Sequence, residues 1–191
     1  MKLIFATNNI NKINEISKIL GDDFKILNLK DIGCFEQLPE NSDTLEDNAK
    51  EKALFIYNKY KTNCFADDTG LEIDVLNGEP GVFSARYAGE ENCSEKNKQK
   101  VLKNMKDKNN RKARFRTVIS LIINGIEYQF TGIINGTILE KPQGKAGFGY
   151  DPIFMPDAYS KSFAEMTITE KNKISHRGIA VRKLTEFLKK I

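Results

Sequence analysis

The feature that most constrains the fold is an Asn-Gly pair between two apolar segments. Residues 116–123 and 126–134 flank Asn124-Gly125. Both central positions of a tight type I′ turn need a positive φ, which asparagine and glycine adopt more readily than other residues, so the pair predicts a two-residue β-hairpin. An antiparallel pair of strands is therefore expected in the second half of the chain.

Helical and strand patterns alternate around this hairpin. Short apolar runs predict strands at 3–6, 26–29, 71–75 and 153–154. Apolar positions three and four apart predict helices at 10–20, 45–60, 94–105 and 180–191. Candidate caps are Asp43-Thr44 for the second helix, Ser94 for the third and Ser175 for the last. Helices alternating with strands predict an α/β protein with a mixed sheet. Because no linker interrupts the 191 residues, we expect one domain over 1–191.

Composition excludes several classes of protein. The net charge of +4 is spread along the chain, which favours a solvated surface over nucleic-acid binding and suits a small polyanionic substrate. Three separated cysteines give no disulfide framework, and Cys64, among apolar neighbours, is expected to be a buried structural thiol. A single histidine excludes a multi-histidine zinc site. The absence of an export signal and of a long apolar run predicts a cytoplasmic protein.

Two adjacent carboxylates, Asp67 and Asp68, follow the apolar residues 64–66 and precede Thr69-Gly70. Adjacent carboxylates that lose hydration repel each other, and a magnesium ion would remove that cost. A polar turn between two strands explains the same residues equally well. One of several acidic residues within 36–47 could complete a metal site.

A strand-to-helix connection carries Thr7, Asn8, Asn9 and Lys12. The free N–H groups at a helix start, together with a lysine, suit a phosphate group. An asparagine-rich helix cap beside a solvated lysine is the favoured interpretation from these local residues alone.

Two later segments could contact a base. Clustered glycines in 144–149 allow close approach of the backbone to a ligand, and Phe148 and Tyr150 offer flat faces. The alternative is a flexible loop anchored by two aromatic side chains. Arg177 could grip a phosphate or a base oxygen with two hydrogen bonds, or belong with His176 to the surface of a helix start.

Five motifs, in this order and spacing, resemble the inosine triphosphate pyrophosphatase family, also called the non-standard purine nucleoside triphosphate pyrophosphatases. The motifs are Thr7-Asn8-Asn9 with Lys12, Ala66-Asp67-Asp68-Thr69-Gly70-Leu71, Ser84-Ala85-Arg86-Tyr87, Gly147-Phe148-Gly149-Tyr150-Asp151-Pro152 and Ser175-His176-Arg177. The resemblance extends from Leu3 to the C-terminal helix.

The resemblance implies hydrolysis of ITP, dITP and XTP to the monophosphate and pyrophosphate, which removes deaminated purines from the nucleotide pool. It implies a two-lobed α/β fold in which helices flank a long twisted mixed β-sheet, with the substrate cleft between the lobes. It also implies a Mg²⁺ cofactor and a homodimer. The only other partner expected is the small-molecule nucleoside triphosphate, with no nucleic acid and no membrane.

Transferred motif by motif, the resemblance gives residues their roles. Asp68 corresponds to the catalytic carboxylate, with Asp67 beside it, and Glu40 and Asp68 correspond to the metal ligands. The residues implied to bind the phosphates, sugar or base are Thr7, Asn8, Asn9, Lys12, Lys52, Thr69, Arg86, Phe148, Gly149, Tyr150, Asp151, Lys171, His176 and Arg177.

Two other functions stay open at this point. One is a related pyrophosphatase for modified pyrimidine nucleotides. The other is a non-catalytic nucleotide-binding or RNA-binding module, which the basic charge permits. Metal-dependent release of pyrophosphate would indicate the enzyme, whereas salt-sensitive RNA binding would indicate the module.

Overall fold

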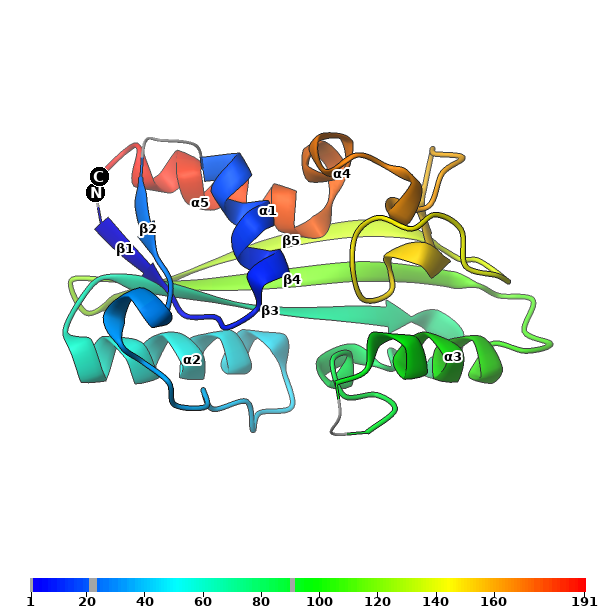
Figure 1. The fold of residues 1–191 in the computed structure, drawn as a ribbon, viewed down its shortest axis with the longest axis horizontal. Helices are drawn as coiled ribbons and strands as arrows, with labels where there is room; N and C mark the ends of the chain where they lie inside the picture. Colours follow the sequence, from blue (N-terminus) through cyan, green and yellow to red (C-terminus); the bar gives the residue numbers. More distant parts are fainter. Residues whose placement is uncertain (1, 21–23, 90–91) are drawn as a thin grey trace. The chain divides into compact units, whose positions relative to one another are not determined.

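The computed structural model describes residues 2–20, 24–89 and 92–191. Its strands form a six-stranded sheet in the order β2-β1-β3-β4-β5-β6. The strands are β1 (Lys2–Phe5), β2 (Lys25–Leu27), β3 (Cys64–Ile73), β4 (Lys112–Ile123), β5 (Ile126–Ile138) and β6 (Phe154–Pro156). The α-helices assigned in these described ranges are α1 (Ile10–Leu20), α2 (Leu45–Tyr60), α3 (Ser94–Asn104), α4 (Ile168–Ile174) and α5 (His176–Leu188) (Figure 1). The predicted α/β class with a mixed sheet is confirmed.

The chain divides into two compact units. Unit 1 comprises residues 1–68, 117–132 and 177–191, and unit 2 comprises residues 69–116 and 133–176. Strands β3, β4 and β5 contribute residues to both units. The predicted single domain and the predicted cleft between two lobes both stay predictions.

Unit 1 has a sheet with a different helix layer on each face (Figure 1). Strand β1 pairs in parallel with β2 and β3. Because side chains alternate along a strand, Leu3, Phe5 and Phe65 lie on the face that α1 and α5 cover. Ile4, Ala6, Cys64 and Ala66 lie on the face that α2 covers. Successive residues of β3 therefore meet different helices.

Cys64 illustrates the packing on the α2 face. Its side chain is buried, and the thiol donates a hydrogen bond to the carbonyl of Ala53 at 3.3 Å. Burial raises the pKa of the Cys64 thiol to about 12, so the thiol stays protonated at neutral pH. The expectation of a buried structural thiol is confirmed.

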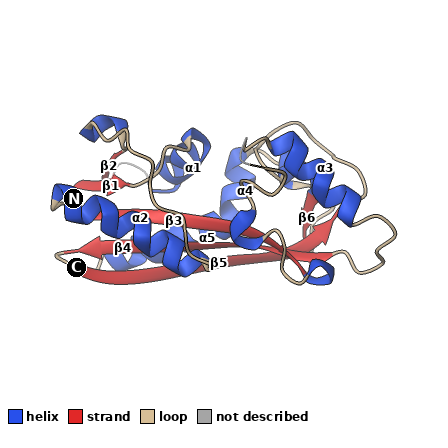
Figure 2. Cartoon of the chain, turned by 90° about the horizontal axis from the view of Figure 1, so that it is seen from below, coloured by secondary structure: helices blue, strands red, loops and turns tan. Residues whose placement is uncertain are grey.

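The central hairpin forms as predicted. Asn124 has a φ of 52° and Gly125 a φ of 82°, as a type I′ turn requires. The turn joins β4 to β5, which lie side by side in the sheet (Figure 2). A two-residue local signal therefore determines where β4 ends and β5 begins.

Unit 2 is built on a separate core of aromatic and aliphatic side chains. Phe115 meets Phe154 edge-on, with ring centroids 4.7 Å apart, and Phe163 packs 5.2 Å from Phe154. Val101 and Met105 bring α3 against the same cluster.

In the part of the chain that the structure describes, no helix has the length and apolar character needed to cross a membrane.

Several element boundaries differ from those predicted. Strand β3 runs without interruption from Cys64 to Ile73, so Asp67 and Asp68 are strand residues and the alternative of a polar turn is wrong. The glycine that suggested a turn, Gly70, instead permits close backbone packing, because a Cβ there would lie 2.7 Å from the Gly81 carbonyl oxygen. The last helix begins at His176, directly after its candidate cap Ser175.

Another difference concerns the cap at the start of α3. Its N-cap is Cys93, with no side-chain capping hydrogen bond, so the prediction that Ser94 caps this helix is wrong. At α2, by contrast, the Thr44 hydroxyl accepts from the Asp47 N–H at 3.1 Å, as predicted.

These two helix starts provide a matched test. We expect Thr44→Ala to lower the free energy of unfolding by about 1 kcal/mol, because one N–H of the first turn loses its acceptor. Ser94→Ala should change it little, since no capping bond is removed. Urea denaturation of both variants measures the difference, and equal losses would contradict the cap assignment.

Candidate active site

The acidic pair lies at the end of the unit 1 part of β3, and its two side chains face opposite helix layers. Asp67 follows Phe65 on the α1 and α5 face, whereas Asp68 follows Ala66 on the α2 face. The two carboxylates therefore avoid each other without a shared metal ion, and each has its own cations.

Asp67 is held by two cations inside unit 1. Its Oδ1 accepts from Lys12 Nζ at 2.9 Å, and its Oδ2 lies 3.4 Å from Arg177 Nε. The side chain of Asp67 is fully buried. Burial alone would raise its pKa, but the charges of Lys12, Arg177 and Lys52 outweigh burial and bring the pKa of Asp67 to about 2. Asp67 is therefore ionised at neutral pH.

Glu15 completes this buried group and was not found from the sequence. Its carboxylate accepts a hydrogen bond from Arg177 Nη1, and both side chains are almost fully buried. Glu15 and Asp67 raise the pKa of Arg177 against the effect of burial. The sequence held one signal for Glu15: it lies one position before Ile16 and three after Lys12, on the inward side of α1.

Asp68 faces a second group of charges on the α2 side. Lys52 Nζ lies 2.9 Å from Asp68 Oδ1 and 2.6 Å from Glu40 Oε1. Burial raises the pKa of Asp68, and Glu40 adds to that rise, while Lys52 and Lys12 oppose it. Although burial acts to lower the pKa of Lys52, the carboxylates of Asp68, Glu40 and Asp67 raise it. The pKa of Asp68 is therefore raised, whereas the pKa of the adjacent Asp67 is lowered.

The segment between β1 and α1 combines the two interpretations offered for it. Asn9 caps α1, since its Oδ1 accepts from the N–H groups of Asn11 and Lys12 at 3.0 and 3.2 Å. Thr7 Oγ1 accepts from the Asn9 N–H at 3.2 Å, and the Asn8 side chain is exposed. The asparagine cap is therefore real. The solvated lysine is wrong, because Lys12 pairs with Asp67 and only 15% of its side chain is exposed.

A possible metal position can be judged from its donors. Within the described ranges, no group of three or more His, Cys, Asp or Glu side chains is arranged to hold a metal ion. Glu40 and Asp68, however, each place an oxygen within hydrogen-bonding distance of the same Lys52 nitrogen. Magnesium commonly binds one or two carboxylates plus waters and substrate phosphates, so these two oxygens fit a site that a triphosphate would complete.

In unit 2, the glycine-rich loop is held by a buried ion pair. Asp151 Oδ2 accepts from Lys171 Nζ at 2.6 Å and from the Phe148 N–H at 2.8 Å. Gly147 and Gly149 have φ values of 73° and 60°, which side chains would oppose. Lys171 Nζ also lies 4.9 Å from the centre of the Phe148 ring. The loop is therefore ordered around Phe148, whose ring stays partly exposed.

Tyr150 and His176 have aromatic or polar contacts of their own in unit 2. The Tyr150 hydroxyl donates to the Ser84 carbonyl at 2.8 Å, and burial raises the pKa of that hydroxyl. The His176 ring stacks on Phe115 with centroids 4.6 Å apart and an interplanar angle of 17°. Tyr150 is thus an anchor of the loop, which is the alternative stated for it.

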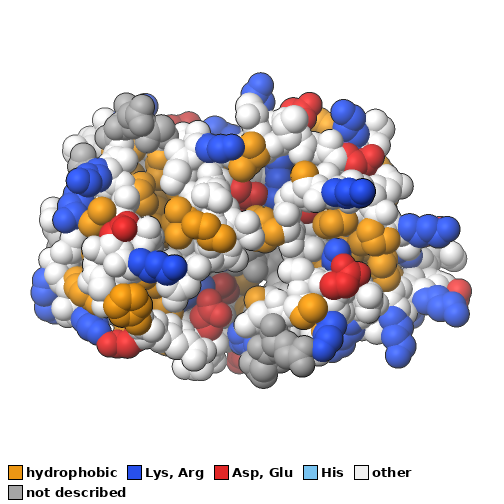
Figure 3. Space-filling model, viewed as in Figure 1, with side chains coloured by type: hydrophobic (Ala, Val, Ile, Leu, Met, Phe, Trp, Pro, Cys, Tyr) orange, Lys and Arg blue, Asp and Glu red, His pale blue; other side chains and the backbone are white. Residues whose placement is uncertain are grey.

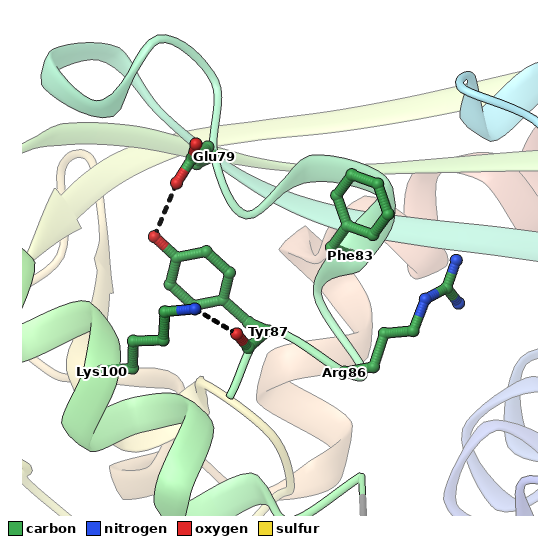
Figure 4. Close-up of a pocket in the computed structure, with 5 residues that line it drawn as sticks. All are labelled: Glu79, Phe83, Arg86, Tyr87 and Lys100. Carbon is green, nitrogen blue, oxygen red and sulfur yellow. Dashed lines mark hydrogen bonds between the residues drawn. The ribbon is translucent and has the colours of Figure 1, made fainter. Parts of the chain in front are cut away.

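Arg86 lies beside a small hollow in unit 2 (Figure 4). Its guanidinium is 5.3 Å from the centre of the Phe83 ring. Across the hollow, the Tyr87 hydroxyl donates to Glu79 Oε2 at 2.8 Å, and Lys100 Nζ donates to the Tyr87 carbonyl at 2.5 Å. The role of Arg86 in substrate binding stays a prediction.

The structure thus assembles the predicted residues into two groups. Unit 1 brings together the phosphate and acid residues Lys12, Glu40, Lys52, Asp67 and Asp68, and adds Arg177. Unit 2 brings together Phe148, Asp151 and Lys171, with His176 nearby on the same aromatic core. Arg177 was expected with His176 at the base, but its guanidinium joins the carboxylates of unit 1; its contact with a base stays a prediction.

Surface charge shows no single basic stripe on the face drawn in Figure 3, where acidic and apolar side chains lie among the Lys and Arg side chains.

The fold is an α/β fold with a mixed sheet, and lysines and carboxylates gather at strand β3. Sites of this kind are typical of proteins that bind phosphorylated ligands. Comparison with known proteins narrows this class to one family.

The profile of the Ham1 family matches residues 3–187, and the chain belongs to this family. A dITP/XTP pyrophosphatase of Flavobacterium psychrophilum is 53% identical over 99% of this chain and 100% of its own length. Among solved structures, a HAM1 protein from Coxiella burnetii has a TM-score of 0.92 and 35% identity, covering all of both chains. The Staphylococcus aureus Ham1 protein has a TM-score of 0.90 and 35% identity, covering 99% of this chain and 98% of its own. The family expected from the motifs is confirmed.

The buried charges of unit 1 give a stability prediction. We expect Arg177→Leu to lower the free energy of unfolding by about 3–5 kcal/mol, because Glu15 and Asp67 would remain buried without their shared cation. Lys18→Leu, which removes an exposed cation from α1, is the control and should leave stability nearly unchanged. Chemical denaturation followed by circular dichroism measures both variants, and similar values for the two would contradict the buried network.

Proposed function

We propose that this chain hydrolyses dITP, ITP and XTP to the nucleoside monophosphate and pyrophosphate, and so removes deaminated purines from the nucleotide pool. One observation carries the proposal: Asp67, paired with Lys12, has a lowered pKa, whereas Asp68, paired with Lys52, has a raised pKa. Full-length relatives named dITP/XTP pyrophosphatase support the same substrate class.

Asp68 is the proposed general base. Burial raises its pKa above the ordinary aspartate value, which makes its carboxylate a better proton acceptor near neutral pH. Asp68 takes a proton from water, and the water oxygen attacks the α-phosphorus. The bond from that phosphorus to the bridging oxygen breaks, and pyrophosphate leaves with the bonding electron pair. Asp67, with a pKa of about 2, remains charged and orients Lys12.

The lysines carry the electrostatic part of the reaction. Lys12 stands in the first turn of α1, where the helix N-terminus also favours anions. Lys52 keeps its charge because the surrounding carboxylates raise its pKa. In this proposal both stabilise negative charge as it develops on the phosphate oxygens. Thr7, Asn8 and Asn9 would contribute the N–H and amide donors of the same phosphate site.

Magnesium is the proposed cofactor, held by Glu40 and Asp68 together with substrate phosphates. When bound, it would neutralise charge on the phosphate oxygens. The homodimer belongs to the same proposal and rests on the family resemblance. The cytoplasmic location and the absence of nucleic-acid and membrane partners are also part of the proposal and rest on the composition of the sequence.

The base is proposed to bind at the unit 2 group. Phe148 would stack on the purine, and the Asp151–Lys171 pair would keep its loop in place. A 6-oxo group accepts hydrogen bonds where adenine carries a donor, so N–H donors at His176 and Arg177 would favour hypoxanthine and xanthine over adenine. Thr69 and Gly149 would complete the contacts to the sugar and base.

The deciding experiment compares substrates and products. Purified protein is incubated with dITP, ITP, XTP, GTP, ATP and a modified pyrimidine triphosphate, with Mg²⁺ or with EDTA. We expect monophosphate and pyrophosphate from the first three only, and no turnover with EDTA. Orthophosphate as product, preference for the pyrimidine, or salt-sensitive RNA binding without turnover would each overturn the proposal.

Asp68→Asn tests the base. We expect kcat for dITP to fall by a factor of about 100 or more, since an amide cannot accept the proton and general-base catalysis contributes about 10²–10⁴-fold. The circular dichroism spectrum should stay that of the parent protein. A variant that keeps most of its activity would remove Asp68 from this role.

Phe148→Ala tests base stacking. We expect KM for dITP to rise about 5- to 150-fold, because stacking of one base on an aromatic ring contributes about 1–3 kcal/mol. Tyr159→Ala removes an exposed aromatic ring elsewhere in unit 2 and should leave KM unchanged. Equal KM values in the parent and the Phe148 variant would count against stacking.

A further inference from the structure

Glu40 lies in a segment that has little regular structure to hold it. Neither helix nor strand is assigned to residues 33–44, all of which the structure describes. The Glu40 side chain is 42% exposed, yet its Oε1 lies 2.6 Å from the buried Lys52 nitrogen. An exposed carboxylate on an irregular segment loses conformational freedom when it is held at one point, so some other contact must restrain the backbone there.

That restraint is visible two residues later, at Ser42. The Asn48 side chain on α2 binds both peptide groups of Ser42: its Oδ1 accepts from the Ser42 N–H at 3.0 Å, and its Nδ2 donates to the Ser42 carbonyl at 3.0 Å. Asn48 is only 1% exposed. A carboxamide that pairs with an N–H and a C=O of the same residue fixes that residue much as a neighbouring strand would.

A third hydrogen bond reaches the same residue. The Ser42 hydroxyl donates to Glu51 Oε1 at 2.7 Å. Asn48, Glu51 and Lys52 are separated by three and four positions, so they project from one side of α2. One helix face therefore holds the segment at Ser42 and presents the ammonium that Glu40 and Asp68 share.

We propose that Asn48 is a positioning residue of this enzyme, which fixes Ser42 so that Glu40 stays aligned with Lys52 and Asp68 to receive the divalent cation. This inference rests on the proposed function and on the place of Glu40 in it. Asn48 contacts neither substrate nor cation in this account, and acts through the backbone of residues 40–42.

Asn48→Ala is the test, with Asn58→Ala as its matched control on an exposed position of the same helix. We expect the Mg²⁺ concentration for half-maximal dITP hydrolysis to rise about 10- to 100-fold in Asn48→Ala, as is typical when support for a metal ligand is lost. At saturating Mg²⁺, kcat and KM for dITP should return close to the parent values. A Mg²⁺ half-saturation equal to that of Asn58→Ala would overturn the proposal.

Two readouts do not need turnover. Mn²⁺ binding in the presence of pyrophosphate, followed by electron paramagnetic resonance, should weaken in Asn48→Ala and not in Asn58→Ala. Amide hydrogen exchange at residues 38–43 should become faster only in the Asn48 variant. Unchanged Mn²⁺ binding, or unchanged exchange in that segment, would refute the positioning role.

Failure of this inference and failure of the proposed function give different results. If the parent protein does not hydrolyse dITP, the proposed function fails, while hydrogen exchange still reports on the Asn48–Ser42 contact. If Asn48→Ala does not fold, Asn48→Leu replaces it, because leucine fills a similar volume and can make neither bond to the Ser42 peptide groups. A folded Asn48→Leu protein with Mg²⁺ half-saturation unchanged from the parent would then overturn the proposal.

Discussion

The ion pairs of Asp67 are the interaction on which unit 1 depends. A strand that carries a carboxylate into a core loses its hydration, and this loss is compensated only by close partners with good geometry. Lys12 from α1 and Arg177 from α5 provide them, while Glu15 balances the second positive charge. These contacts connect three elements that are distant in sequence, so the same interaction that neutralises Asp67 also fixes where α1 and α5 pack.

The period of the β-strand explains how adjacent aspartates acquire different properties. One residue along β3 moves a side chain to the opposite face, and the two faces meet different helices. Asp67 meets one buried and one largely buried cation and remains an anion. Asp68 meets one lysine together with another carboxylate and holds a proton more readily. Environments that push the pKa values of two like groups apart are typical of acid–base assignments in enzymes.

Local rules predicted the elements better than the contacts. The Asn124-Gly125 turn and the Thr44 cap depend on residues at most a few positions apart, and both are confirmed. The partners of Asp67 lie 55 and 110 positions away, and no local pattern contains that pairing. Family motifs placed Lys12 and Arg177 among the substrate residues, but their buried pairing with Asp67, and the very existence of Glu15 as a partner, needed the fold. The strand through Gly70 was missed because its glycine serves backbone packing against Gly81.

The wide sequence separation within this charge group bears on synthesis by the ribosome. Glu15 and Arg177 are 162 positions apart, so a growing chain exposes Asp67, Lys12 and Glu15 long before their guanidinium partner exists. Until residue 177 emerges, the α5 side of β3 lacks both its helix and one of its cations, and loop closure over such distances is slow. Unit 1 therefore cannot reach its native state during most of translation. During that interval the uncovered apolar sheet face is open to aggregation.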